Sequence, residues 1–176
     1  MVVDIPADIP SELEPIAKEI HRIHESAVWN SQGHFEQMKL WRAMNMVLGV
    51  PASVLAAIAG GTGLAATQAT SVPGILALTA AGFGAALTTL NPSRRAELAH
   101  ASATAYLEIQ TAARQLLTVR LARLGFEEAD EELRALTSRR DAVNKSADAI
   151  NSYSYRRARR NTSGMGVQEF EIDKVA

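Results

Sequence analysis

The sequence predicts an all-α fold: a two-helix transmembrane hairpin with an N-terminal approach helix and a long C-terminal cytoplasmic helical hairpin. The stretch from Ala43 to Ser93 contains no Asp, Glu, Lys, Arg or His. A polar connector from Thr67 to Gly74 divides this stretch in two. Each piece is close to the 20 or so apolar residues with which a helix crosses roughly 30 Å of hydrocarbon. The flanking segments carry apolar residues at the three- and four-residue spacings of amphipathic helices.

These patterns divide the chain into four parts. Residues 1–43 form an N-terminal cytoplasmic or interfacial helical segment. Residues 44–90 form the transmembrane hairpin, with crossings near 44–66 and 72–90. Residues 91–160 form the cytoplasmic helical hairpin, and residues 161–176 form a flexible tail.

Composition excludes several classes of protein. The 18 basic and 19 acidic residues give a formal net charge of -1, so no global attraction to nucleic acid is expected. The absence of Cys excludes a disulfide framework and thiolate metal sites. The N-terminus has no basic region followed by an apolar one, so we expect no cleavable signal peptide and insertion through the internal hairpin.

Ala-rich helices buried in a soluble bundle are the alternative to membrane crossings. The first crossing has few Leu, Ile and Val side chains, so its insertion is marginal, which supports the alternative. A soluble bundle helix, however, keeps charged residues on its outer side, and neither crossing has any. The lack of a charged face favours the membrane.

An amphipathic helix is expected before the first crossing. Ser11 is the expected N-cap, and Pro15 falls in the first turn or just after it. The apolar face of this helix comprises Leu13, Ile16, Ile20, Ile23 and Ala27. We expect Asn30 to Gly33 to interrupt the helix, after which a helical period resumes at Phe35, Met38, Trp41, Asn45 and Leu48.

His21, His24 and Glu25 share a helix face and raise the question of a metal site. Two His and one carboxylate suit zinc, but no third strong ligand lies nearby in the sequence. We therefore interpret them as a solvated polar face. No Ser/His/Asp or Cys/His arrangement is evident either, so neither enzymatic activity nor a cofactor is expected.

Small residues recur along both crossings. The first crossing is expected to restart at Pro51, because Pro suits the first turn of a helix. The glycines from Ala59 to Gly63 follow no strand and lack the Lys of a phosphate-binding loop. Small side chains let helix backbones approach closely in lipid. Helix packing and oligomerisation are therefore assigned to Ser53, Ala57, Gly60, Gly61, Gly63, Ala77, Ala81 and Ala85.

Two helices cannot enclose a pore alone, so a path for water or ions would need several subunits. The candidate pore-lining residues are Thr62, Thr67, Thr79, Thr88 and Thr89. The alternative, held at even weight, is that these hydroxyls bond to their own helix backbone. The crossings contain no carboxylate or His, so a proton relay or coupled transporter is not expected.

Residues that suit the membrane surface flank the crossings. Trp41 and Arg42 precede the first crossing, and Arg94 and Arg95 follow the second. The connector has no basic residue, so the positive-inside rule places both termini in the cytoplasm.

Two further helices are expected after the second crossing. Asn91 caps the first of them with Pro92 at its first position, and Gly125-Phe126 stops it. Its apolar face is assigned to Leu98, Ser102, Ala105, Ile109, Ala112, Leu116 and Val119. The next helix begins with an acidic cluster from Glu127 to Glu132 that suits the helix dipole. Its seam comprises Leu133, Leu136, Val143, Ala147 and Ile150, interrupted by Arg140.

A basic run with interleaved tyrosines lies between Tyr153 and Arg160. Such a run can bind RNA or single-stranded DNA. Near a membrane it more often meets anionic lipid, so nucleic acid is not the expected partner.

This order of parts resembles the SLATT domain family, the two-transmembrane effectors associated with SMODS nucleotidyltransferases and SLOG sensors in bacterial conflict systems. The resemblance covers roughly Ser11 to Arg160. It rests on His21, His24, Trp29 and Trp41, on Leu48-Gly49-Val50-Pro51, on Gly61-Thr62-Gly63, on Asn91-Pro92-Ser93 before Glu97-Leu98-Ala99-His100, and on Tyr106-Leu107-Glu108-Ile109.

The resemblance implies a membrane effector that forms a homo-oligomer and perforates or depolarises the bacterial inner membrane. It implies a trigger from a sensor protein or a cyclic-nucleotide-type activator, and cell death or arrest as the result. This chain departs from the fused versions because it shows no separate sensor domain. The alternatives are a non-conducting membrane scaffold whose cytoplasmic helices recruit a partner, and a holin-like lysis protein.

Overall fold

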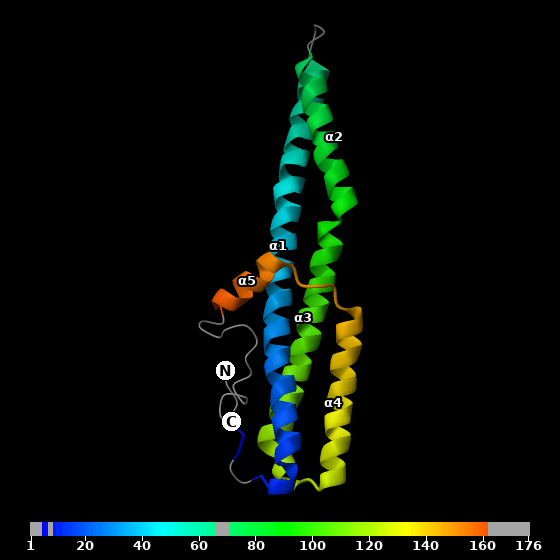
Figure 1. Ribbon diagram of the computed structural model, residues 1–176. Coiled ribbons are helices and arrows are strands. Elements are labelled where there is room, and N and C mark those ends of the chain that lie inside the picture. Colours follow the sequence, from blue (N-terminus) through cyan, green and yellow to red (C-terminus); the bar gives the residue numbers. More distant parts are fainter. Residues whose placement is uncertain (1–4, 7–8, 66–70, 162–176) are drawn as a thin grey trace. The chain divides into compact units, whose positions relative to one another are not determined.

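The computed structural model describes residues 5–6, 9–65 and 71–161. In chain order it contains η1 (Ser11–Leu13), α1 (Glu14–Ala65), α2 (Val72–Leu90), α3 (Pro92–Gln115), η2 (Leu116–Arg120), η3 (Leu121–Arg123), α4 (Phe126–Ser146) and α5 (Ser152–Asn161). All of these elements are helical, and the described residues contain no strand (Figure 1). The expected all-α class is confirmed.

The chain divides into two compact units. Unit 1 comprises Met1–Gln37 and Leu98–Ala176, and unit 2 comprises Met38–Glu97. The N-terminal helical segment and the C-terminal helices therefore belong to the same unit, although the uncharged stretch separates them in sequence.

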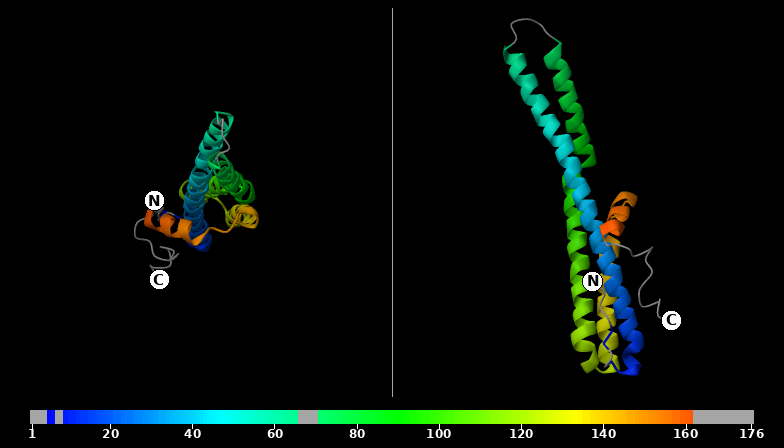
Figure 2. Two further views of the ribbon diagram at one scale, coloured as in Figure 1. Left: turned by 90° about the horizontal axis from the view of Figure 1, so that it is seen from above. Right: turned by 90° about the vertical axis from the view of Figure 1, so that its left-hand side faces the viewer.

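In unit 1, the first part of α1, the later part of α3 and α4 lie side by side (Figures 1 and 2). The predicted apolar face is confirmed, because its five residues, Leu13 at the end of η1 and Ile16, Ile20, Ile23 and Ala27 of α1, are all buried. They meet Tyr106, Ile109, Ala113, Leu116, Leu117, Leu121, Ala129 and Leu136 in one core. Leu133, Val143 and Ala147 of the predicted α4 seam pack against this core.

The antiparallel course of α3 and α4 is fixed by two polar contacts at opposite ends. Arg120 pairs with Glu132 near the connection between the two helices. Far from that connection, the Tyr106 hydroxyl donates to Asn144 Oδ1 at 2.5 Å. These pairs lie at increasing distance from the connection along both helices, as an antiparallel pair requires.

In unit 2, the later part of α1 runs opposite to α2. A Cβ built on Gly63 would lie 3.9 Å from Pro73, and one on Gly49 would lie 3.8 Å from Leu87. As predicted, Asn91 stands between α2 and α3, and Pro92 is the first residue of α3. Asn91 adopts a left-handed conformation with φ 44°, which Asn tolerates better than most residues. Its Oδ1 accepts a hydrogen bond from the Arg94 N–H at 3.4 Å.

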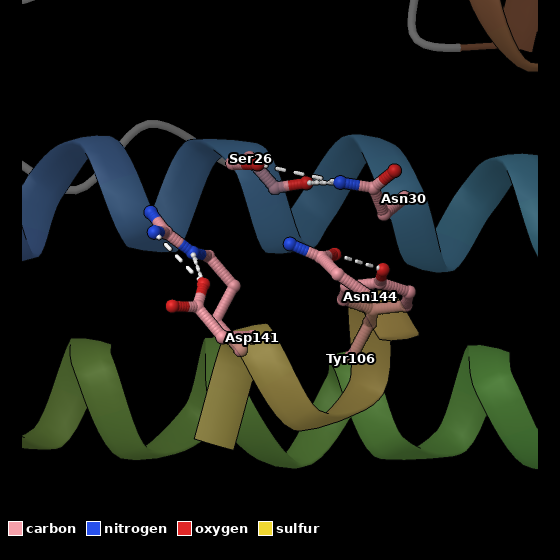
Figure 3. Close-up of polar contacts among 6 residues, drawn as sticks. Ser26, Asn30, Tyr106, Asp141 and Asn144 are labelled. Carbon is pink, nitrogen blue, oxygen red and sulfur yellow. Dashed lines mark hydrogen bonds and ion pairs between the residues drawn. The ribbon is translucent and has the colours of Figure 1, made fainter. Parts of the chain in front are cut away.

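Four predicted helix boundaries are wrong, at Ser11, at Asn30–Gly33, at Pro51 and at Gly125. Ser11 is the first residue of the turn η1 and not an N-cap; the Leu13 N–H donates to the Pro10 carbonyl at 2.9 Å. Helix α1 continues through Asn30–Gly33, where Asn30 Nδ2 donates to the Ser26 carbonyl at 2.8 Å. Asn30 therefore bonds within the helix and does not open a turn, as Figure 3 shows.

Helix α1 also continues through Pro51, where a restart was predicted. A Pro removes one intrahelical donor. Just beyond it, the Ser53 hydroxyl donates to the carbonyls of Gly49 and Val50 at 2.9 and 3.0 Å.

The helix after Pro92 differs from prediction in its face and in its end. Leu98 and Val119 are exposed, whereas the buried stripe runs through Ala96, Ala99, Ala103, Tyr106, Ile109 and Ala113. The smallest side chains allow the neighbouring helices to approach, so size was a poor guide to burial.

The helical path ends with the wide turn η2, whose Leu116 and Leu117 are both buried, and the tight turn η3. Gly125 is the N-cap of α4 and not a C-terminal stop.

Candidate membrane-spanning surface and buried polar layer

The uncharged stretch of unit 2 is exposed along almost its whole length. Among its described residues, only Ala59, Ala80 and Pro92 are buried. The large apolar side chains exposed on it are Met46, Val47, Val50, Val54, Ile58, Val72, Ile75, Leu78 and Leu90. Two helices of the described chain are long and apolar enough to cross a membrane. Hardly any of the apolar window of either helix is buried inside the described chain.

A groove lined by small residues runs between α1 and α2 within unit 2. It has a volume of about 770 Å³. Its lining comprises Gly49, Ala52, Ser53, Ala56, Ala59, Gly60, Pro73, Ala77, Ala80 and Ala81. Of the predicted packing residues, Ser53, Gly60, Ala77 and Ala81 line the groove. Ala57, Gly61, Gly63 and Ala85 are not among its lining residues, and their role in packing stays a prediction.

Three of the candidate pore-lining threonines bond to their own helix. The hydroxyls of Thr62, Thr79 and Thr88 donate to the carbonyls four residues earlier at 2.8, 2.8 and 3.0 Å. This is the alternative that the sequence left open. Thr89 is exposed at the end of α2, and Thr67 lies outside the described residues.

The predicted flanking residues gather at one end of unit 2. The Arg95 guanidinium carbon lies 4.9 Å from the centre of the Trp41 ring, a cation–π contact between α1 and α3. Arg42 and Arg94 are exposed beside them in sequence. The cationic and aromatic side chains that suit a headgroup layer therefore meet across the two helices that border the uncharged stretch.

Unit 1 contains a buried polar layer that the sequence interpretation missed. Its buried polar residues are His21, His24, Ser31, His34, Glu36, Gln37 and Ser154. The expectation that His21 and His24 form a solvated face is wrong, because both are nearly inaccessible. A signal was present, since the period of buried positions continues from Ala27 through Ser31, His34 and Met38 at helical spacings.

Burial controls the protonation of two of these histidines. Loss of hydration lowers the pKa of His24 to about 4, with a smaller contribution from the neighbouring His21. Burial also lowers the pKa of His34, although Asp148 acts in the opposite direction. Among the described residues, no group of three or more His, Cys, Asp or Glu side chains has an arrangement that could hold a metal ion.

His34 of α1 contacts α3. Its ring stacks on Tyr106, with centroids 5.6 Å apart and planes 12° from parallel. The Tyr106 hydroxyl, whose pKa burial raises, donates to Asn144 of α4 (Figure 3). Asn144 of α4 therefore supplies the acceptor for the Tyr106 hydroxyl, and the ring of the same tyrosine stacks on His34.

The helix α5 contacts α1 through an ion pair with the buried carboxylate of Glu36. Arg157 Nε lies 3.0 Å from Glu36 Oε2, and the Glu36 side chain is only 2% exposed. The preceding segment fits closely on α1, because a Cβ on Gly33 would lie 2.6 Å from Ile150 Cδ1. Gln37 Nε2 also donates to the Ala149 carbonyl at 3.4 Å. Residues 149–157 thus contact one turn of α1.

Comparisons with known proteins give no family for this chain. No protein-family model, no curated protein and no solved structure matches it.

Proposed function

We propose that this chain is a two-span membrane protein whose α1 and α2 form a transmembrane hairpin. The single observation that carries this proposal is the exposed, uncharged surface of unit 2. An exposed apolar patch of this extent costs free energy in water and is stabilised by lipid or by another apolar surface. The basic residues Arg42, Arg94 and Arg95 would then face the cytoplasm, with both termini on that side.

The groove between α1 and α2 supports assembly into a homo-oligomer. In lipid, helices associate where small residues let their backbones approach closely. Apolar side chains alone give no driving force for association, because the lipid chains around them are equally apolar. A groove of about 770 Å³ lined by Gly, Ala, Ser and Pro leaves room for a helix of a second copy. Gly60→Leu places a large side chain in this groove and should shift purified protein toward smaller species in size-exclusion chromatography with light scattering. Gly74→Leu, which is outside the groove lining, is the matched control.

For the oligomer we propose the role that the resemblance to SLATT proteins implies. The chain is then an effector of a bacterial anti-phage or conflict system that permeabilises the inner membrane when a nucleotide signal or a partner sensor triggers it. The buried polar layer of unit 1 suits a protein that a trigger switches between two states. Buried polar groups favour one arrangement of the core, and the same groups can bond to water when that arrangement opens.

A second candidate is a non-conducting scaffold, and one observation favours it. The hydroxyls of Thr62, Thr79 and Thr88 donate to carbonyls of their own helix, so their hydrogens are not offered to water or ions along a path.

Two measurements test the proposals in turn. Extraction of membranes at high pH should leave the protein in the lipid pellet; release as a soluble species would refute the transmembrane hairpin. Purified oligomer is then reconstituted into dye-loaded liposomes. Dye or ion release supports the effector, and membrane-inserted protein that releases neither, with or without candidate nucleotides, supports the scaffold.

A further inference from the structure

The helix α5 is the most strongly basic element of the chain. Its sequence from Ser152 to Asn161 contains four Arg and no acidic residue. Ser154 and Ala158 are buried, whereas Tyr153, Tyr155 and Arg156 are exposed. One face of the helix is therefore used for packing, and the other presents aromatic and cationic side chains to the surroundings.

The packed face is fixed in three ways. Arg157 pairs with the buried Glu36 of α1. Asn151 begins the helix, with its Oδ1 accepting from the Ser154 N–H at 2.7 Å. The Ile150 side chain fits against Gly33. One arginine therefore satisfies the buried carboxylate, and Arg156 has no ion-pair partner among the described residues.

The position of the attachment on α1 is informative. Glu36 precedes Arg42, the last charged residue before the uncharged stretch, by six residues of the same helix. The axis of α5 crosses that of α1 at this point and does not run along it (Figures 1 and 2). Along the sequence of α1, the attachment of α5 therefore lies about two helical turns before the uncharged stretch begins.

We propose that α5 is an interfacial helix that binds anionic lipid headgroups through Arg156 and the tyrosines. This inference rests on the proposed transmembrane hairpin. Arg contributes attraction to the phosphates, and Tyr suits the boundary between headgroups and acyl chains. The charge of α5 complements an anionic leaflet, whereas it gives no reason to bind zwitterionic lipid.

A site-specific probe tests this proposal, because the chain has no native Cys. An environment-sensitive fluorophore is attached to Ser152→Cys on α5 and, as a control, to Ser138→Cys on α4; both positions are exposed. Full-length protein is reconstituted into nanodiscs of zwitterionic lipid or of the same lipid made anionic with phosphatidylglycerol. The emission of the Ser152 probe should shift to the blue only in the anionic discs, and that of the Ser138 probe in neither.

Variants then assign the effect to charge. Arg156→Gln should reduce the docked fraction of α5 by a few-fold, since one Arg near an anionic surface is worth about fivefold in binding. Arg139→Gln, at an exposed arginine of α4, should leave it unchanged. Added salt should weaken the shift as well.

The outcomes that overturn the inference are distinct from failure of the proposed function. Protein that resists alkaline extraction but gives equal spectra in both kinds of disc refutes the interfacial helix and leaves the hairpin standing. A shift produced by single-stranded RNA, and not by anionic lipid, also refutes it and identifies α5 as a nucleic-acid site. Protein extracted by alkali refutes the hairpin itself.

Discussion

At the scale of single residues, Glu36 shows how the fold handles a charge that it removes from water. Its side chain is almost inaccessible, while its partner Arg157 remains 58% exposed. Removal of one member of such a pair leaves the other without compensation, and this usually costs more than the pair contributes. The cost of removing one member is smaller here than for a fully buried pair, because water reaches the position that the arginine occupies.

Arg157→Gln should therefore loosen α5 from α1 and lower the free energy of unfolding by about 1–3 kcal/mol. Hydrogen exchange of the amides in α5 measures the first effect, and thermal unfolding measures the second. The double variant Glu36→Gln, Arg157→Gln should recover part of the loss, because no buried charge remains. Equal protection of α5 in wild type and in Arg157→Gln would contradict this role for the pair.

His24 predicts a dependence of stability on pH. Its pKa in the folded protein is about 4, below the ordinary value of 6.5 expected in the unfolded chain. Between these values the unfolded chain binds the proton and the folded protein does not, so acid favours unfolding. The stabilisation is complete above pH 6.5 and is lost as the pH falls toward 4.

The free energy of unfolding should accordingly fall below pH 6.5 with a slope of up to about 1.4 kcal/mol per pH unit for this one proton. Chemical denaturation of the detergent-solubilised protein between pH 4 and pH 7.5 measures the slope. His24→Gln should flatten the profile and leave a smaller dependence from His34, whose pKa burial also lowers. A profile identical to that of wild type would show that His24 becomes protonated without unfolding.

At the scale of the elements, α3 shows that burial follows the partner helices and not side-chain size. Ile109 is buried and Leu98 is exposed, although both lay on the face predicted from sequence. Ile109→Ala should lower the free energy of unfolding by about 2–5 kcal/mol, because it leaves a cavity in the core of unit 1. Leu98→Ala should change it by less than about 0.5 kcal/mol, as exposed sites do.

Equilibrium denaturation of the two variants under the same conditions gives the comparison. Both variants replace a large aliphatic residue of one helix with Ala, which is the better helix former, so helix propensity does not explain a loss of stability at either site. A loss of stability at Leu98 as large as that at Ile109 would mean that the predicted face, which contains both residues, meets the core.

The sequence predicts helices well where one signal is strong. The bounds of α2, the cap at Asn91 and the buried face from Leu13 to Ala27 follow from local patterns of Pro, Asn and large apolar residues. The faces of α3 and the polar layer do not, because both depend on contacts between distant segments. His34 is buried by Tyr106, which lies 72 positions later, and no local pattern contains that contact.

The residues that line the groove between α1 and α2 could be predicted only in part, because local patterns show the small residues but not the contact between the two helices. The four-residue recurrence of small residues identifies a ridge on each helix, as it did for Ser53 and Ala77. It does not say which of two adjacent ridges faces the other helix. Gly60 lines the groove, whereas its neighbour Gly61 is not among the lining residues.

At the scale of the whole molecule, the uncharged surface has different consequences in water and in lipid. Leu78 is the most exposed large apolar residue, at 76%, and lies near the middle of α2. In a membrane, Leu78→Arg should oppose insertion by about 2.5–3.5 kcal/mol and reduce the membrane-bound fraction. In a water-soluble protein the same change would increase solubility.

Membrane fractionation after expression distinguishes the two cases. Leu107→Arg, a change of the same kind at an exposed position of α3 in unit 1, should leave the distribution unaltered. Wild-type protein that is already in the soluble fraction, with a higher soluble yield for Leu78→Arg, would argue that the surface is covered by another protein and not by lipid.

Unit 1 is assembled from both ends of the chain, with the uncharged stretch between its two pieces. During translation, the first 37 residues leave the ribosome long before Leu98 and its successors exist to cover them. Ile16, Ile20 and Ile23 therefore have no core residues from α3 and α4 to pack against while the apolar middle of the chain emerges. If the uncharged stretch inserts into the bilayer as proposed, it is made before the later partners of the first helix, so insertion does not require the bundle of unit 1 to open.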